Sequence, residues 1–105
     1  MELKNINIRT ILIEAIRENG IIVDVRTKEE FVSGHIPMAI NIPLEDIESG
    51  FVNIPINKYL IVYCENGGNS ALAARILMEM GYEVANTVGG LKNYNGAITK
   101  NTQNI

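Results

Sequence analysis

The sequence predicts an α/β fold in which an open, mostly parallel sheet carries helices on both faces. Short β-branched runs, which are typical of buried parallel strands, alternate along the chain with amphipathic segments at helical spacing. Glycines and prolines separate these segments at short intervals, as expected where crossover connections join parallel strands. The 105 residues, 47% of them hydrophobic, suit a single domain, residues 1–105, whose core needs no crosslinks.

The first predicted unit is a helix followed by a strand. Apolar residues recur at helical spacing from Ile8 to Ile16, and Asn19-Gly20 provides a signal for the end of this helix. The run IIVDV, residues 21–25, has the composition of a strand in a parallel sheet. The next segment, TKEEFVSGH, predicts a short helix that starts at Thr27 and ends at Gly34.

Two short elements precede the clearest strand. AINIP, residues 39–43, predicts a brief strand, and LEDIESG, residues 44–50, predicts a short helix. YLIVY, residues 59–63, is the clearest strand, and EVANTV, residues 83–88, is a weaker one. The helix between them ends at Gly81, and we expect its apolar stripe to face the core: Leu72, Ala73, Ile76, Leu77 and Met80. After Gly89-Gly90 the chain turns towards a polar tail from Thr99, which we expect to fray.

Composition argues against several classes of partner. The net charge is −3, and the lysines and arginines form no basic stripe, so we expect no nucleic-acid partner. One cysteine and one histidine provide neither a disulfide framework nor zinc-site spacing, so we expect no metal. The apolar runs are far shorter than the roughly 20 residues of a membrane span, and no charged leader precedes one of them. We therefore expect a cytoplasmic protein with no membrane partner.

The single cysteine stands where a ligand site is expected. Cys64 directly follows the predicted strand 59–63, and open α/β sheets bind ligands outside the carboxyl ends of their strands. In the segment YCENGGNS, Gly67-Gly68 permits the backbone to curve so that successive N–H groups converge near the sulfur. Such amides, together with the N-terminus of the next helix, favour a thiolate and would equally hold a persulfide. A buried cysteine that serves only as a small apolar side chain is the alternative.

Four stretches of the chain resemble the rhodanese-like domain family. They occur in the family's order and spacing and read IIVDVRTKEEFVSGHIPMAINIP, IVYCENGGNSA, AARILMEMGYEV and VGGLKNYNGAI. The resemblance extends over roughly residues 6–97 and leaves residues 98–105 as a polar tail. It implies a rhodanese-like open sheet of about five mostly parallel strands, with an active-site loop that opens with Cys64.

The resemblance also implies a sulfurtransferase that needs no cofactor. In this family the cysteine, here Cys64, takes sulfane sulfur from a donor such as thiosulfate or a small persulfide, for example glutathione persulfide. The resulting persulfide passes its outer sulfur to a thiophilic acceptor, which is cyanide, a thiol or a partner protein. The substrate-binding loop would consist of Glu65, Asn66, Gly67, Gly68, Asn69 and Ser70. Asp24 and Arg26 would brace this loop by hydrogen bonds and charge pairing.

Two loop positions depart from the family pattern. Asn69 stands where members that use thiosulfate usually have an arginine, and neutral asparagine only partly imitates a bidentate grip on an oxyanion. Glu65 adds a carboxylate close to the thiolate, where it opposes ionisation and repels dianionic donors. We therefore expect weak turnover of thiosulfate.

Two further residues in matched positions are expected to be structural. The resemblance implies that His35 of the GHIP segment is buried and hydrogen-bonded within its own turn, and a general base for Cys64 is the alternative. Ser70 is expected to cap the following helix through its hydroxyl group.

Three other functions remain open at this stage. A binding or regulatory module on the same fold would explain the missing arginine, although the retained Cys64 argues against it. A phosphatase of this fold would need a longer loop and an arginine for the phosphoryl group. A thiol-redox role would lack a second cysteine in the chain to resolve a sulfenic acid.

Overall fold

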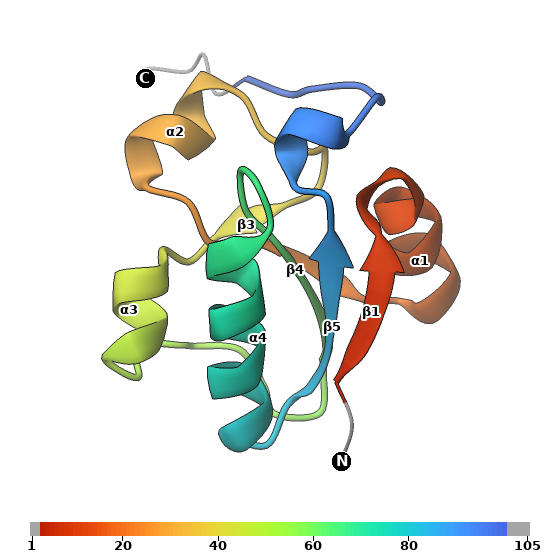
Figure 1. The fold of residues 1–105 in the computed structure, drawn as a ribbon. Coiled ribbons are helices and arrows are strands. Elements are labelled where there is room, and N and C mark those ends of the chain that lie inside the picture. The colour runs from red at the N-terminus through yellow and green to blue at the C-terminus, as the bar shows by residue number, and fades with distance from the viewer. Residues whose placement is uncertain (1–2, 101–105) are drawn as a thin grey trace.

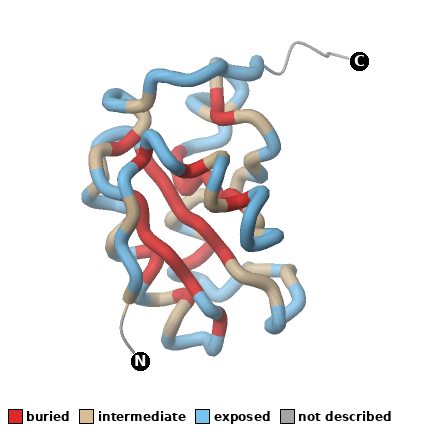
Figure 2. The backbone as a smooth tube through the Cα atoms, turned by 90° about the vertical axis from the view of Figure 1, so that its right-hand side faces the viewer, coloured by how far each residue is buried: buried red, intermediate tan, exposed pale blue. Residues whose placement is uncertain are grey.

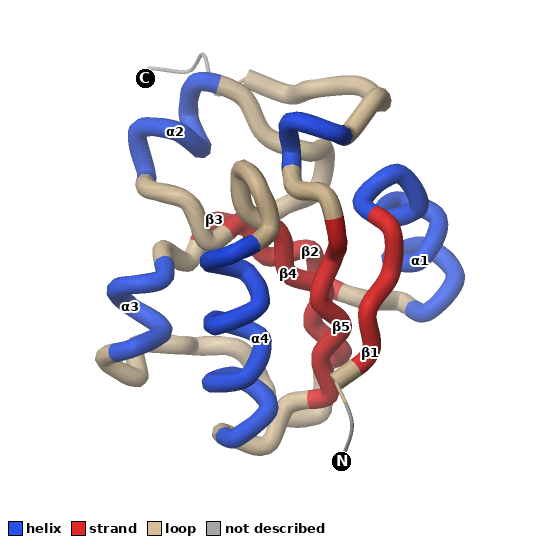
Figure 3. The backbone as a smooth tube through the Cα atoms, in the orientation of Figure 1, coloured by secondary structure: helices blue, strands red, loops and turns tan. Residues whose placement is uncertain are grey.

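Five strands form one entirely parallel sheet in the computed structural model, which describes residues 3–100 (Figures 1 and 3). Their spatial order is β1-β5-β4-β2-β3, so β4 lies at the centre. The strands are β1 (Lys4–Asn7), β2 (Ile21–Asp24), β3 (Ile40–Asn41), β4 (Tyr59–Tyr63) and β5 (Glu83–Val88). The helices are η1 (Ile8–Thr10), α1 (Ile11–Glu18), α2 (Lys28–Ser33), α3 (Leu44–Glu48), α4 (Gly68–Glu79) and η2 (Leu91–Asn93), of which η1 and η2 are 3₁₀ turns.

Helices cover both faces of the sheet, as the sequence predicts. In Figure 1, α3 and α4 lie on one side of the sheet and α1 lies on the other. Side chains of β4 alternate accordingly: Leu60 and Val62 belong to the apolar cluster under α3 and α4, whereas Ile61 and Tyr63 belong to the cluster under α1. Figure 2 shows the buried backbone running through the middle of the molecule. The continuous apolar run of YLIVY is therefore that of a strand buried on both faces.

The sequence placed most of these elements correctly. The predicted strands at residues 21–25, 39–43, 59–63 and 83–88 correspond to β2, β3, β4 and β5, although β3 has only two residues. Thr27 begins α2 with a reciprocal capping box, because its hydroxyl accepts from the Glu30 amide and the Glu30 carboxylate accepts from the Thr27 amide.

Strand β1 was not predicted from the residues, although the family resemblance implies about five strands. Its sequence KNIN is polar and pairs with β5 at the edge of the sheet. Only Ile6 packs against the core, so no apolar run indicates the strand.

Two predictions about α4 are wrong. Leu72 is 45% exposed and Met80 is 39% exposed, so neither belongs to the core. The buried face of α4 instead carries mostly small side chains, which let the helix pack closely: Ser70, Ala73, Ala74 and Leu77. Ser70 is not the helix cap, because α4 begins two residues before it and Gly67 occupies the N-cap position.

Two further predictions concern the polar tail and the possibility of a membrane span. Thr99 is held in place by two backbone hydrogen bonds with His35, of 2.9 and 2.8 Å, so it is not frayed. The rest of the polar tail after Lys100 lies outside the described residues. Within residues 3–100, no helix has the length and apolar character needed to cross a bilayer.

Candidate active site

The carboxyl ends of β2 and β4 place the predicted site residues together. Asp24 and Tyr63, the last residues of these strands, are partners in the parallel register. The amide of Val25 also donates to the carbonyl oxygen of Tyr63 at 3.1 Å, which extends the pairing beyond the strand ends. Cys64 therefore leaves the sheet beside the segment that carries Arg26, and both residues line the same hollow.

Two backbone amides point at the sulfur of Cys64. Its Sγ accepts hydrogen bonds from the amide of Gly67 at 3.0 Å and from the amide of Ser70 at 3.3 Å. Gly67 has φ of +105°, a left-handed conformation that brings its N–H round to the sulfur and that glycine adopts without strain. Among the described residues, the amides of Gly67 and Ser70 are the two from the predicted loop that donate to Sγ. They form a small anion nest at the N-terminus of α4.

The hydroxyl of Ser70 does not cap the helix as predicted but forms a different hydrogen bond. It donates to the carbonyl oxygen of Gly67 at 3.2 Å and so closes the turn in front of the sulfur. Because this bond fixes the peptide of Gly67 relative to α4, the Ser70 side chain holds the nest in shape. Ser70 itself is fully buried.

The cysteine loop is braced from outside by the segment after β5. The amides of Leu91 and Lys92 donate to the carbonyl oxygens of Cys64 and Glu65, at 2.8 and 3.1 Å. Gly90, with φ of +69°, leaves no room for a side chain, since a Cβ there would lie 2.5 Å from Cα of Asn66. The sequence predicts only a turn at Gly89-Gly90. The contact between Gly90 and Asn66 joins residues that are far apart in the sequence, so no local pattern indicates it.

A buried network fixes the segment next to the loop. Nη2 of Arg26 lies 2.8 Å from Oδ2 of Asp24, and Nε donates to the same carboxylate at 3.1 Å. The Tyr63 hydroxyl donates to Oδ2 of Asp24 at 2.6 Å and accepts from the Ile36 amide at 3.0 Å. Burial opposes the charge of Arg26, but the hydrogen bonds and charge of Asp24 outweigh it and raise the pKa of Arg26. Burial, followed by the bond to Asp24, raises the pKa of Tyr63.

Arg26 connects this network to the cysteine loop. Its Nη1 lies 3.4 Å from Oε1 of Glu65, and its Nη2 also donates to the carbonyl oxygen of Gly34 at 2.6 Å. Asp24 is fully buried and Arg26 is 8% exposed, whereas the Glu65 side chain is 51% exposed. The expected bracing of the loop by Asp24 and Arg26 thus has a direct geometric basis.

Most of the predicted site residues share one pocket of about 260 Å³. Its lining includes Cys64, Glu65, Asn66, Asn69 and Arg26. Gly67, Gly68, Ser70 and Asp24 are not part of this lining; Gly67 and Ser70 contact the sulfur through their amides, and Asp24 contacts Arg26. Cys64 is only 2% exposed, so a reagent has to enter the pocket to reach it.

His35 is structural, as expected. Its ring stacks on Phe31 with centroids 3.8 Å apart, and Nδ1 lies 2.8 Å from the Phe31 carbonyl oxygen. The residue is 5% exposed and does not line the pocket of Cys64. The geometry gives it no role as a base for the cysteine.

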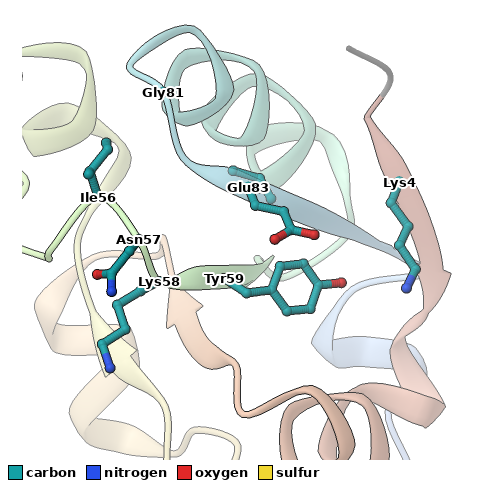
Figure 4. A pocket seen from close by; sticks show the side chains of 8 residues that line it. Lys4, Ile56, Asn57, Lys58, Tyr59, Gly81 and Glu83 are labelled. Atoms are coloured by element: carbon teal, nitrogen blue, oxygen red, sulfur yellow. The ribbon is translucent and has the colours of Figure 1, made fainter.

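A larger hollow lies at the opposite edge of the sheet (Figure 4). It measures about 450 Å³ and includes Tyr59 and Glu83, which are register partners at the start of β4 and β5. Lys4 pairs with Glu14 at 2.7 Å, and the Tyr59 hydroxyl donates to the same carboxylate at 2.8 Å. The hydrogen bond from Lys4 lowers the pKa of Glu14, and burial followed by Glu14 raises that of Tyr59. No cysteine lines this hollow, so its size does not make it the reactive site.

The chemistry of the pocket rests on the cysteine. Within residues 3–100, no cluster of three or more histidine, cysteine, aspartate or glutamate residues could hold a metal ion. A thiolate whose charge is stabilised by two amides is a nucleophile ready for attack on an electrophilic sulfur.

Comparison with known proteins identifies the family of the chain. A family model described as "Rhodanese-like domain" matches residues 9–97. The chain is 40% identical over 72 residues to the thiosulfate sulfurtransferase PspE of Escherichia coli, covering 67% of this chain and 69% of that protein. It is 36% identical over 75 residues to a sulfurtransferase of Allochromatium vinosum, covering 70% of each. A tRNA sulfurtransferase of Desulfurococcus amylolyticus is 36% identical over 88 residues, which are 84% of this chain but only 17% of that protein.

Solved structures give the same result for the fold. A rhodanese-like domain protein from Staphylococcus aureus matches with a TM-score of 0.81 and 27% identity, covering 93% of this chain and 98% of that one. A rhodanese homologue from Thermus thermophilus matches with a TM-score of 0.70 and 32% identity, covering 85% of this chain and 98% of that one.

Proposed function

The chain belongs to the rhodanese-like domain family, and on this premise we propose that it is a sulfurtransferase that carries sulfane sulfur on Cys64. The observation that carries the proposal is the pair of amides, of Gly67 and Ser70, that donate to Sγ of Cys64 inside a pocket. Relatives named sulfurtransferase and thiosulfate sulfurtransferase support the same class of reaction.

In the first half-reaction the Cys64 thiolate attacks the outer sulfur of the donor. A bond forms between Sγ and that sulfur, while the donor's own sulfur–sulfur bond breaks. Thiosulfate would leave as sulfite, and a persulfide RSS⁻ or RSSH would leave as the thiolate RS⁻. The amides of Gly67 and Ser70 donate to Sγ and stabilise negative charge on the nucleophile.

In the second half-reaction an acceptor removes the outer sulfur. Cyanide would leave as thiocyanate, and a thiolate would become a persulfide, in each case with the bonding electrons returning to Sγ of Cys64. The anion nest stabilises the cysteine thiolate as the leaving group, just as it stabilises the nucleophile. One site therefore serves both steps of a ping-pong transfer, without a cofactor or a metal.

The other site residues shape and hold the pocket. Gly67, Gly68 and Ser70 form the turn around the sulfur, while Glu65, Asn66 and Asn69 line the space where a donor would lie. Asp24 and Arg26 keep the loop in place through the contact with Glu65. We place the protein in the cytoplasm, where an unpaired thiolate stays reduced.

Thiosulfate is a poor fit for this pocket. Asn69 cannot form the two charge-assisted hydrogen bonds of an arginine, and Glu65 places negative charge at the entrance. A persulfide, either small or on another protein, is therefore preferred to thiosulfate as the donor, and glutathione persulfide is a convenient reagent with which to test this. A thiol, including a partner protein's thiol, is the preferred physiological acceptor, with cyanide as a convenient substitute.

A binding or regulatory module is the second candidate function. The neutral Asn69 and the acidic Glu65, in place of an anion grip, are the observations that favour it. In that case the loop would contact a partner and Cys64 would carry no sulfur. The intact nest around Sγ favours the enzyme, since a module without chemistry has no need of it.

Formation of thiocyanate distinguishes the two functions. Purified protein is given cyanide with either glutathione persulfide or thiosulfate, and the rate is compared with that of Cys64→Ser, which reports the uncatalysed background. We expect wild-type protein to exceed this background with the persulfide, and to a lesser degree with thiosulfate. Equal rates for the two proteins with both donors would overturn the proposal and favour the binding module.

A further inference from the structure

Carboxylates from three separate elements line the pocket of Cys64. Glu30 belongs to α2, Glu45 belongs to α3, and Glu65 belongs to the cysteine loop. All three residues are exposed, so their charges face the water through which a sulfur carrier approaches. The segments between them are long, and only the fold brings these charges to one rim.

The single cation of the lining, Arg26, is already neutralised. Asp24 contacts its guanidinium at 2.8 Å, and Glu65 lies 3.4 Å from its other terminal nitrogen. The Gly34 carbonyl oxygen takes a further N–H at 2.6 Å. An incoming anion would have to displace Glu65 to reach this guanidinium, so Arg26 does not offset the negative rim.

Within residues 3–100, the carboxylates of Glu30 and Glu45 are not paired with a cation. Glu30 bonds to the backbone amide and hydroxyl of Thr27, which are neutral groups. Within residues 3–100, no ion pair includes Glu45. Asn69, which also lines the pocket, adds no positive charge.

The pocket is a reaction site on separate grounds, since it contains the Sγ of Cys64 with its two amide donors. We infer that Glu30, Glu45 and Glu65 make this pocket selective for sulfur carriers with a positive charge beside the sulfur. Such a carrier is a thiol or persulfide with an ammonium or guanidinium group close by. The inference rests on the proposed function for its biological meaning, because it names the class of donor and acceptor.

Charged methanethiosulfonates test this selectivity without any sulfur transfer. In these reagents the thiolate attacks the sulfenyl sulfur, a disulfide forms, and methanesulfinate leaves. Cys64 is the chain's only cysteine, so added mass reports this site alone. The labelling rates of 2-(trimethylammonium)ethyl and 2-sulfonatoethyl methanethiosulfonate are measured on folded protein, and again on the same chain unfolded in urea.

We expect the ratio of the cationic to the anionic labelling rate to be about tenfold higher for the folded protein than for the unfolded chain. Two or three net negative charges within several ångströms of the sulfur would produce a ratio of this size. Sodium chloride at about 1 M shortens the screening length to roughly 3 Å and should remove most of this preference. Equal ratios for folded and unfolded protein, or no labelling of folded Cys64 by either reagent, would overturn the inference.

A matched pair of variants on α3 locates the effect. Glu45→Gln removes a pocket charge, whereas Glu48→Gln removes the same charge from an exposed position of the same helix outside the pocket. We expect the preference to fall about threefold in Glu45→Gln and to stay unchanged in Glu48→Gln. An equal change in both variants would mean that overall charge, and not the pocket, sets the preference.

Two experiments with sulfur acceptors distinguish a small cationic thiol from a cationic segment of a protein. Protein carrying a Cys64 persulfide is given cysteamine or a peptide with lysines on both sides of one cysteine, each beside its anionic counterpart, 3-mercaptopropionate or a peptide with glutamates. Faster transfer to either cationic thiol supports the inference, and the faster arm identifies a small carrier or a protein segment. Failure of Cys64 to form a persulfide would defeat the proposed function alone, because the labelling ratio still reports charge selection.

Discussion

The two ends of β4 carry the same three-part arrangement in different surroundings. At the carboxyl end, the Tyr63 hydroxyl donates to Asp24 at 2.6 Å, and Asp24 pairs with Arg26 at 2.8 Å. At the amino end, the Tyr59 hydroxyl donates to Glu14 at 2.8 Å, and Glu14 pairs with Lys4 at 2.7 Å. The bond lengths are nearly equal, so distance alone does not distinguish them.

Burial is what separates the two arrangements. The side chains of Asp24 and Arg26 are 0% and 6% exposed, whereas those of Glu14 and Lys4 are 12% and 54% exposed. Water screens the outer pair, and such pairs contribute little to stability. The inner pair is excluded from water, so the loss of one partner leaves an uncompensated charge. The buried arrangement is also the one that contacts the cysteine loop, through Arg26 and Glu65.

The largest expected effect comes from removal of the buried carboxylate. Asp24→Asn removes the buried counter-charge of Arg26, leaves only the exposed Glu65 carboxylate beside it, and should lower the free energy of unfolding by about 3–5 kcal/mol. The matched variant Glu14→Gln at the other end should lower it only slightly, because Lys4 is solvated. Unfolding in urea, followed by far-UV circular dichroism, measures both. Comparable losses in the two variants would show that burial does not separate the arrangements.

Removal of the tyrosine hydroxyls should give the next largest effect. Tyr63→Phe leaves the buried Ile36 amide without an acceptor and removes one of the three donors to Oδ2 of Asp24, which should cost about 1–3 kcal/mol. Tyr59→Phe leaves only the partly exposed Glu14 carboxylate without this donor, so water can replace it. The same urea titrations apply, and a larger loss in Tyr59→Phe would refute the comparison.

The same change of charge is made at each end of β4, and only the change at the carboxyl end should alter the turnover of thiosulfate. Asn69→Arg with Glu65→Ala supplies an oxyanion grip beside Cys64 and should raise kcat/KM for thiosulfate by about tenfold, which is about 1.4 kcal/mol. Asn57→Arg with Glu83→Ala makes the same charge change in the hollow at the amino edge. This control should leave kcat/KM unchanged. An unchanged or lower value in the first double variant would show that Asn69 and Glu65 do not limit the use of thiosulfate.

Alkaline pH should give the smallest effect. Burial and Asp24 raise the pKa of Tyr63 above its ordinary value of 10.0, so the unfolded state loses this proton first. The stabilisation is complete below pH 10 and is lost as pH rises, by about 0.8 kcal/mol between pH 9 and pH 10.5. Tyr63→Phe should lose this part of the pH dependence in urea titrations at the two pH values. A variant with the full wild-type dependence would assign the alkaline loss to other groups.

Local features of the site were predictable from the sequence. The alternation of strands and helices gave the fold class, and the position of Cys64 after YLIVY placed it at the carboxyl edge of the sheet. Gly67 then indicated a turn that could aim amides at the sulfur, which the Gly67 and Ser70 contacts confirm. These features depend on residues that are neighbours along the chain.

Features that depend on distant residues were not predictable. Nothing in the sequence near Tyr63 indicates that its hydroxyl joins Asp24 to the Ile36 amide, and Gly90 gives no sign that it contacts Asn66. Strand β1 depends on its pairing with β5 and not on its own polar residues. In the predicted stripe of α4, Ala73 and Leu77 are buried as expected, but Leu72 is exposed and Ala74, which was not predicted, is buried.

The central claim is that the carboxyl end of β4 presents a sulfur-carrying cysteine. The most direct test is the intact mass of the protein after incubation with glutathione persulfide, and separately with thiosulfate, followed by removal of the donor. The account predicts one added sulfur atom on the wild-type protein, more completely from the persulfide, and none on Cys64→Ser. Wild-type protein that gains no sulfur from either donor would contradict the account and leave the fold as a binding module.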